Sequence, residues 1–130
     1  MANRLHHVAL GARDVECVAA FYRDRLGLPE VARHLQPDGS LRSVWLDLGG
    51  PVLMIERTQE QVRPVNGVGA GPFLLALALT PAECEACEQS LAAVGVRVES
   101  RTEHTRYFRD PEGNRVAVSS HPLRSPDNHT

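Results

Sequence analysis

The chain shows one order of apolar and polar stretches twice. Residues 5–10 alternate in strand fashion, a helical stretch follows, and strand-like runs close the first copy at residues 52–56. The second copy begins at residues 73–79, continues with a helical stretch, and closes at residues 115–119. Each copy contains one strand, one helix and three strands, and so small a unit cannot bury both faces of its sheet alone. The sequence therefore predicts an α+β fold of two βαβββ modules, which pack against each other or against another chain.

Both predicted helices begin with capping residues. Asp14 can accept a hydrogen bond from the first helical turn, and the apolar stripe that follows it ends at Gly27. The string Thr80-Pro81-Ala82-Glu83 combines a capping threonine, a proline that fits the first turn and a glutamate that can reach back to the cap. The second helix should therefore begin after Thr80 and run to about Val94.

The remaining strands follow from apolar runs bounded by turn residues. We expect strands over residues 31–35, 43–48, 96–99 and 105–109. The domain boundaries follow from the same pattern together with a glycine- and proline-rich stretch between the copies. They give a first module over residues 1–57, a linker over 58–71, a second module over 72–121 and a polar, disordered tail over 122–130.

Composition narrows the range of partners. With 14 basic and 16 acidic residues the formal net charge is -2, so no excess of positive charge favours nucleic acid or an anionic membrane. No apolar run reaches membrane-spanning length, and the start Met-Ala-Asn-Arg lacks a secretory profile. We therefore expect a cytoplasmic protein whose partner is a small molecule or a second copy of the chain.

The string Cys84-Glu85-Ala86-Cys87 has the spacing of redox and zinc sites. Cys84, Cys87, Leu91 and Val94 also form an apolar stripe along the predicted helix, so buried core thiols are the simpler interpretation. The chain has three cysteines, an odd number, which argues against a disulfide framework.

Two strings are specific in combination. Residues 21–28 read Phe-Tyr-Arg-Asp-Arg-Leu-Gly-Leu, shortly after a His-Val-Ala-Leu opening and Asp14, and residues 107–114 read Tyr-Phe-Arg-Asp-Pro-Glu-Gly-Asn. Together with the repeat, these strings resemble the vicinal oxygen chelate superfamily over roughly residues 5–121. That superfamily includes glyoxalase I, bleomycin-resistance proteins and extradiol dioxygenases.

The resemblance implies both architecture and chemistry. In that family the two modules curl their sheets into a cup, here a partly open, eight-stranded, barrel-like sheet with the helices outside, and homodimers are usual. Enzymatic members hold a divalent metal with side chains from four positions, one on the first and one on the last strand of each module. Open coordination positions then let a substrate with two adjacent oxygens chelate the metal, which polarises it.

Carried over by the resemblance, the four ligand positions are mostly without donors in this chain. His7 matches the first position. The second module places Leu74 and Ala117 at its two positions, and neither side chain can ligate a metal. In the first module Met54 takes the remaining position by symmetry with Ala117. We therefore expect no resident metal and no other cofactor.

Glu56 leaves a divalent metal possible. It lies two residues beyond Met54 on the same strand face, about 6.6 Å away. Glu56 could therefore take the ligand position of Met54 only if the register of the strand shifted. If a metal is bound, His7 and Glu56 are its candidate ligands. His104 and His121, which flank strands of the second module, are the histidines to examine as further donors.

Period-two alternation divides the predicted strands into two faces. Branched apolar residues form the face that should back onto the helices, whereas the other face mixes apolar and polar side chains, as small-molecule pockets do. Trp45 is a candidate stacking surface, although the pattern leaves its face open. The predicted ligand-binding residues are His7, Trp45, Met54, Glu56, Leu74, Ala117 and Ser119. The competing interpretation is that Trp45, Met54 and Leu74 only fill a closed barrel.

The leading hypothesis is a metal-free member of the resembled superfamily that binds a small molecule in the cup, for example as a resistance or sequestration protein of the bleomycin-resistance type. His7 and Glu56 are its expected polar anchors. A metal-dependent lyase, isomerase or dioxygenase is the alternative, and a dimeric scaffold is the third. The sequence leaves open which ligand is bound and whether the modules pair within or between chains.

Overall fold

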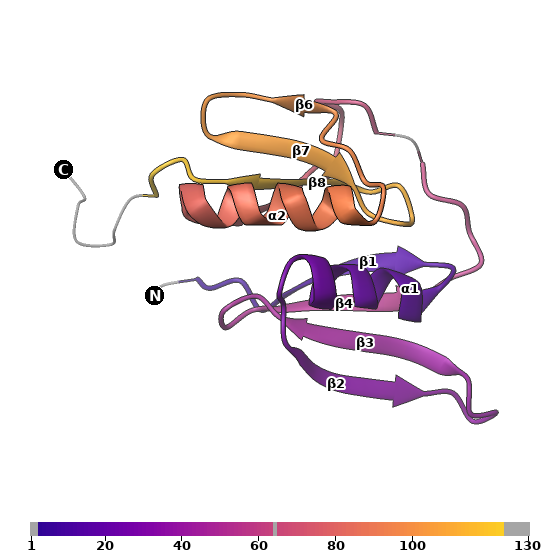
Figure 1. The fold of residues 1–130 in the computed structure, drawn as a ribbon. Coiled ribbons are helices and arrows are strands. Elements are labelled where there is room, and N and C mark those ends of the chain that lie inside the picture. The colour runs from indigo at the N-terminus through magenta and orange to yellow at the C-terminus, as the bar shows by residue number, and fades with distance from the viewer. Residues whose placement is uncertain (1–2, 64, 124–130) are drawn as a thin grey trace. The chain divides into compact units, whose positions relative to one another are not determined.

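The structure, a computed structural model, describes residues 3–63 and 65–123 and contains the βαβββ arrangement twice (Figure 1). The chain divides into two compact units. Unit 1 contains residues 1–65 and 110–114, and unit 2 contains residues 66–109 and 115–130. Each repeat forms its own open sheet of four strands. The predicted α+β fold of two βαβββ modules is confirmed.

The first module forms a mixed sheet in the order β1-β4-β3-β2, in which β1 is parallel to β4 and the other pairs are antiparallel. Its elements are β1 (His7–Ala12), α1 (Val15–Ala20), η1 (Phe21–Arg25), β2 (Glu30–Leu35), β3 (Leu41–Asp47) and β4 (Val52–Arg57).

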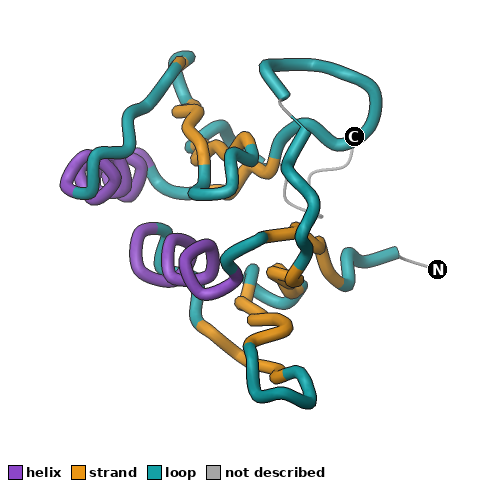
Figure 2. Tube along the Cα trace, turned by 90° about the vertical axis from the view of Figure 1, so that its right-hand side faces the viewer, coloured by secondary structure: helices purple, strands orange, loops and turns teal. Residues whose placement is uncertain are grey.

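The core of the first module lies between its helix and one sheet face. In Figure 2 the helix follows one side of its own strands. Val15 and Val18 of α1 are buried, as are alternate residues of the sheet. The buried sheet residues are Val44, Leu46, Leu53 and Ile55. This alternation leaves the residues between them, on β3 and β4, for the opposite face.

The first helix is shorter than the apolar stripe predicts, because its second half widens into the π-helical turn η1. The start is as expected, since Asp14 Oδ1 accepts a hydrogen bond from Cys17 N at 3.0 Å. Tyr22, within the π-turn, is fully buried, and its hydroxyl donates to Asp110 Oδ2 at 2.7 Å. Gly27, with a φ of 73°, ends the segment in a left-handed conformation that glycine adopts without strain.

The turn over residues 110–114 belongs to unit 1, although the strands on either side of it belong to unit 2. Asp110 also accepts hydrogen bonds from the backbone N–H of Glu112 and of Asn114. The side-chain amide of Asn114 donates a further one, and all three distances are 2.9 Å. Arg13 Nε donates to Glu112 Oε1 at 2.7 Å. The two strings that underlie the family resemblance therefore meet in space, and these contacts are structural.

The second module repeats the topology in the order β5-β8-β7-β6. Its elements are β5 (Leu75–Ala78), α2 (Pro81–Ala93), β6 (Ser100–Arg101), β7 (Thr105–Arg109) and β8 (Arg115–Ser119). The predicted capping box is present, because Glu83 N donates to Thr80 Oγ1 and Thr80 N donates to Glu83 Oε1. Cys84, Cys87 and Leu91 of α2 are buried and the thiols are free, which confirms the core interpretation of the cysteine pair. Val94, the last residue of the predicted stripe, is 50% exposed and follows the end of the helix.

The strand expected over residues 96–99 is shifted. Val96 N–H bonds back to Leu91 O at the end of the helix, and strand pairing starts only where Glu99 N–H reaches Tyr107 O. The observed β6 is therefore Ser100–Arg101. Likewise β5 begins at Leu75 and not at residue 73. The expected disordered tail lies outside the described residues from residue 124 onward.

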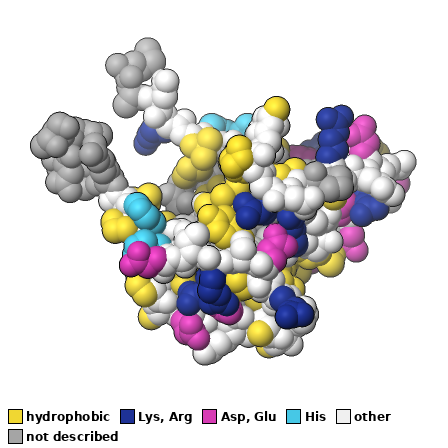
Figure 3. Space-filling model, turned by 90° about the horizontal axis from the view of Figure 1, so that it is seen from above, with side chains coloured by type: hydrophobic (Ala, Val, Ile, Leu, Met, Phe, Trp, Pro, Cys, Tyr) yellow, Lys and Arg dark blue, Asp and Glu magenta, His cyan; other side chains and the backbone are white. Residues whose placement is uncertain are grey.

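The surface shows no dominant charge on the face drawn in Figure 3, where basic and acidic side chains are intermingled with apolar ones. This agrees with the formal net charge of -2. Among the described residues no helix is long and apolar enough to cross a membrane.

Candidate functional site

The strand register decides which face of the first sheet Trp45 occupies. Ala9 pairs with Met54, and Met54 pairs with Trp45, so these three side chains lie in one row across β1, β4 and β3. The row lies on the face opposite the buried residues Leu46 and Leu53. Trp45 therefore shares a face with Met54, and we call this surface the open face of unit 1.

A second row on the open face contains the more polar groups. Glu56 pairs with Gly11 on one side and with Ser43 on the other, and Ser43 pairs in turn with His34 of β2. Ser43 is buried, whereas Glu56 and His34 are half-buried. His7, the first residue of β1, pairs with Val52 and lies at the edge of the same face. The structure thus brings four predicted residues of the first module to one face.

Trp45 and His34 form an aromatic pair on the open face. Their ring centroids are 4.7 Å apart and the rings are tilted by 60°. Trp45 Nε1 and His34 Nε2 are both buried and have no hydrogen-bond partner within the described part of the chain. A buried polar atom without a partner costs about 1–3 kcal/mol, so both atoms favour a bound polar group. Sequence reasoning missed His34, because only the register of β2 against β3 places it beside Trp45.

His7 is exposed and interacts with its neighbour. The Nδ1 atoms of His6 and His7 are 2.8 Å apart, and the rings meet edge to face. At that distance one ring carries the shared proton and the other accepts it. Nδ1 of His7 is therefore already engaged, and the other ring nitrogen is the one that remains for a ligand.

The two candidate metal ligands, His7 and Glu56, do not fit one shared divalent ion. His7 pairs with Val52 and Glu56 pairs with Gly11, so the two candidate ligands are four strand positions apart, roughly 13 Å. Two side chains so far apart on one sheet face cannot share an ion. Among the described residues no three His, Cys, Asp or Glu side chains are grouped to hold a metal.

The corresponding open face of unit 2 is lined by small side chains and a few polar ones. Ala117 of β8 pairs with Ala76 on one side and with Tyr107 on the other. Ala117 is fully buried. Ser119 follows on the same face, and its hydroxyl lies 2.7 Å from that of Thr105. Leu74 is half-buried and lies just before β5.

Tyr107 and Arg115 are two large groups on the open face of unit 2. The Arg115 guanidinium lies 4.3 Å from the centroid of the Tyr107 ring. Sequence reasoning placed both residues on strands but did not select them. Counting back two residues from Ala117 would have found Arg115, because the period of two puts both on the same face.

His104 and His121 lie beside each other in unit 2. Their ring centroids are 5.4 Å apart in an edge-to-face arrangement. His121 Nδ1 lies 3.1 Å from Pro122 O, and His104 Nε2 lies 3.7 Å from Glu103 Oε2. The two histidines that the sequence singled out therefore form a pair with each other.

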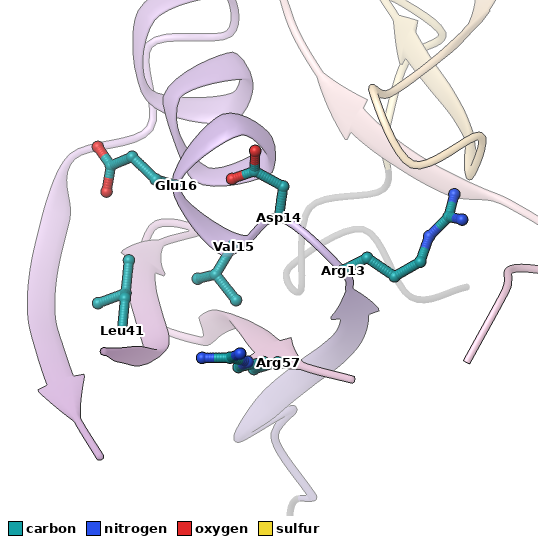
Figure 4. Close-up of a pocket in the computed structure, with 6 residues that line it drawn as sticks. All are labelled: Arg13, Asp14, Val15, Glu16, Leu41 and Arg57. Carbon is teal, nitrogen blue, oxygen red and sulfur yellow. The ribbon is translucent and has the colours of Figure 1, made fainter. Parts of the chain in front are cut away.

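A hollow of about 300 Å³ lies beside the start of α1 (Figure 4). Its lining residues are Arg13, Asp14, Val15, Glu16, Leu41 and Arg57. Most of its charged groups already have partners: Asp14 caps the helix, Arg13 binds Glu112, and Glu16 lies 3.0 Å from Arg33. This hollow therefore offers few free groups to a ligand, in contrast to the open faces.

Comparison with known proteins defines the class. The sequence profile of the Glyoxalase/Bleomycin resistance protein/Dioxygenase superfamily matches residues 4–118. The chain belongs to this superfamily. No curated protein sequence matches this chain.

Solved structures with the same fold include enzymes. Lactoylglutathione lyase from Agrobacterium tumefaciens has a TM-score of 0.66 and 26% sequence identity, with 91% of this chain and 93% of that chain covered. A mutant of the fosfomycin resistance protein FosX from Listeria monocytogenes, in complex with Mn(II) and 1S,2S-dihydroxypropylphosphonic acid, has a TM-score of 0.78 and 17% identity, covering 95% and 96%. Oxidase ChaP-H2 has a TM-score of 0.73 and 18% identity, covering 96% and 98%.

Proposed function

We propose that this protein binds a small molecule on its open sheet faces, without a metal held at the family's ligand positions. The observation that supports the proposal most directly is the Trp45–His34 pair, whose two buried ring nitrogens have no hydrogen-bond partner within the described residues. Aromatic rings with buried nitrogens that lack partners among the described residues are costly in a closed core and favour a ligand site.

The chemistry of this surface suggests a ligand class. Trp45 Nε1 can only donate a hydrogen bond, whereas His34 Nε2 can donate or accept. The neighbouring Ala9 and Met54 are apolar, and a thioether packs well against aromatic rings. We infer that the ligand contains a planar, unsaturated group with an oxygen acceptor. In this proposal His7 and Glu56 are polar anchors at the two ends of the open face of unit 1. Leu74, Ala117 and Ser119 are the proposed ligand-binding residues of unit 2.

Binding without metal chemistry favours a role in sequestration. Leu74 and Ala117 have no donor atoms, and His7 and Glu56 are too far apart in register to share an ion. A resistance protein of the bleomycin-resistance type needs to hold its ligand and not to convert it. This is the function that the side chains support best.

A metal-dependent lyase, isomerase or dioxygenase is the second candidate. It is favoured by His7, which stands at the family's first ligand position, and by the enzymes among the structures of the same fold. Metal analysis of protein purified without chelator separates the two. Near-stoichiometric metal that is lost in His7→Ala would replace the sequestration proposal with the enzymatic one.

Trp45 provides the direct test, because it is the single tryptophan of the chain. We expect bleomycin or 1-naphthol, titrated into the metal-free protein, to change the intrinsic tryptophan emission in a saturable manner. His34→Ala should weaken binding of the responding probe about fivefold or more, since one hydrogen bond and one stacking contact are lost. His121→Ala removes an exposed histidine from unit 2 and serves as the matched control. Emission that no probe changes, or equal affinities in the two variants, would contradict the proposal.

A further inference from the structure

Arg115 differs from the other arginines of its sheet. It opens β8, and its side chain is only 15% exposed. Its Nε atom is buried and makes no hydrogen bond to any described residue. By contrast, Arg101 and Arg106 on the helix-facing side each bind Glu88 of α2 with a nitrogen–oxygen distance of 2.7 Å.

Arg115 shares its neighbouring carboxylate with a second arginine. Arg109 lies directly opposite Arg115 in the β7–β8 pairing, and like charges in that position repel. Glu99 is the carboxylate between them, but Arg109 Nε occupies its two oxygens at 3.0 and 3.3 Å. Arg115 Nε is 3.8 Å from Glu99 Oε1, beyond hydrogen-bond distance. Two guanidinium groups thus share one carboxylate.

The Tyr107 ring holds the Arg115 guanidinium in position. A cation 4.3 Å from a ring centroid is attracted to the aromatic face, and the contact restricts the long side chain without using its N–H donors. Tyr107 pairs with Ala117 and Ala117 pairs with Ala76, so small side chains lie in the row next to Arg115. A largely desolvated cation whose Nε–H has no partner among the described residues can bind a carboxylate or phosphate.

We propose that Arg115 is an anion subsite on the open face of unit 2, which binds the carboxylate or phosphate group of a small molecule. This inference goes beyond the proposed function, because it is argued from the contacts of Arg115 within unit 2 alone. The bound anion would accept a hydrogen bond from Nε. It would also add to Glu99 in reducing the repulsion between Arg115 and Arg109.

The test uses the full chain, with inorganic phosphate and benzoate as probes and chloride at equal ionic strength as reference. We expect both probes to shift the ¹⁵N–¹H resonance of Arg115 Nε, which is assigned by its absence in Arg115→Lys. In Arg115→Gln the affinity for the probes should fall about tenfold or more, since a charge-assisted hydrogen bond is lost. Arg97→Gln removes the same charge from an exposed position of unit 2 and should bind as the parent does.

Equal affinity of Arg115→Gln and Arg97→Gln would overturn the inference, and so would an Arg115 Nε resonance that neither probe moves. The resonance of the parent protein decides the question if Arg115→Gln fails to fold. The Trp45 titration is independent of these measurements. Failure of the proposed function would appear as silent Trp45 emission, and failure of this inference as a silent Arg115 resonance.

Discussion

At the scale of single residues, the hydrogen bond between Tyr22 and Asp110 joins side chains 88 residues apart in sequence. Both are buried, and burial together with the nearby carboxylate raises the pKa of the Tyr22 hydroxyl well above its ordinary value. The hydroxyl therefore stays protonated and keeps donating to Asp110. The two residues belong to the strings that identify the family, so these strings report the fold more than the ligand.

Tyr22→Phe should destabilise the protein by about 1–3 kcal/mol, because one of the buried Asp110 oxygens loses a donor. Urea unfolding followed by circular dichroism measures the change. Tyr107→Phe is the matched control, since the Tyr107 hydroxyl makes no hydrogen bond to a described residue. A Tyr22→Phe variant as stable as Tyr107→Phe would show that the contact is not structural.

The three free thiols should differ in reactivity. Cys17 is exposed, whereas Cys84 and Cys87 are buried, and burial raises the pKa of the Cys87 thiol to about 11. Since the thiolate is the reactive form, a disulfide reagent near neutral pH should label Cys17 first and the buried pair only on unfolding. Cys17→Ser should abolish the early reaction. Rapid labelling of both helix cysteines would restore a redox or metal role for the pair.

At the scale of elements, the capping box sets the start of α2. Thr80→Ala should cost about 1 kcal/mol of stability, because the N–H of Glu83 loses its acceptor. Thr102→Ala, at an exposed threonine in a turn of the same unit, is the control. Thermal and urea unfolding of the two variants measures the difference, and equal stabilities would contradict the assigned role of the cap.

The same box predicts a pH dependence with a defined sign. The backbone N–H of Thr80 and then its side chain lower the pKa of Glu83 below its ordinary value. A group whose pKa is lowered on folding stabilises the fold above its unfolded pKa and loses that contribution as the pH falls through the folded value. The stability advantage of the parent over Glu83→Gln should therefore be constant near neutral pH and shrink in acid. An advantage that grows in acid would contradict this assignment.

At the scale of the whole molecule, we predict a homodimer. The edge strand β2 exposes Val31 and Leu35, which are 54% and 59% accessible, and an unpaired edge with apolar side chains favours association. Light scattering at micromolar concentrations should give twice the chain mass. Leu35→Glu should weaken the dimer, whereas Val68→Glu, at an exposed valine of unit 2, should not. A monomer mass for the parent protein would remove the prediction.

The family alignment itself can be tested by restoring donors. If His7, Met54, Leu74 and Ala117 occupy the family's ligand positions, the combined variant Met54→Glu, Leu74→His and Ala117→Glu should bind Mn²⁺ or Zn²⁺ much more tightly than the parent. Calorimetry measures the affinity, and circular dichroism checks the fold. A folded variant that binds metal no better would show that the residue assignments are wrong.

The sequence by itself determined the repeat, the family and most element boundaries, because these depend on local signals. The period of two in β8, the capping box of α2 and the turn residues over 110–114 all lie within a few residues of the feature they specify. The same period of two along β1 and β4 predicted that His7, Met54 and Glu56 share a face, as observed. Alternation along one strand can be recognised without knowledge of its partner strand.

Only the tertiary structure decided how strands pair and which distant side chains meet. Register placed Trp45 beside Met54, His34 beside Trp45, and Glu56 four positions from His7. The π-turn around Tyr22 lies next to Asp110, a contact that no local pattern contains. Pairing and long-range hydrogen bonds depend on segments far apart in the chain, and their energies are realised only when those segments are brought together. For the same reason, only the structure shows that ring or guanidinium nitrogens of Trp45, His34 and Arg115 lack partners among the described residues.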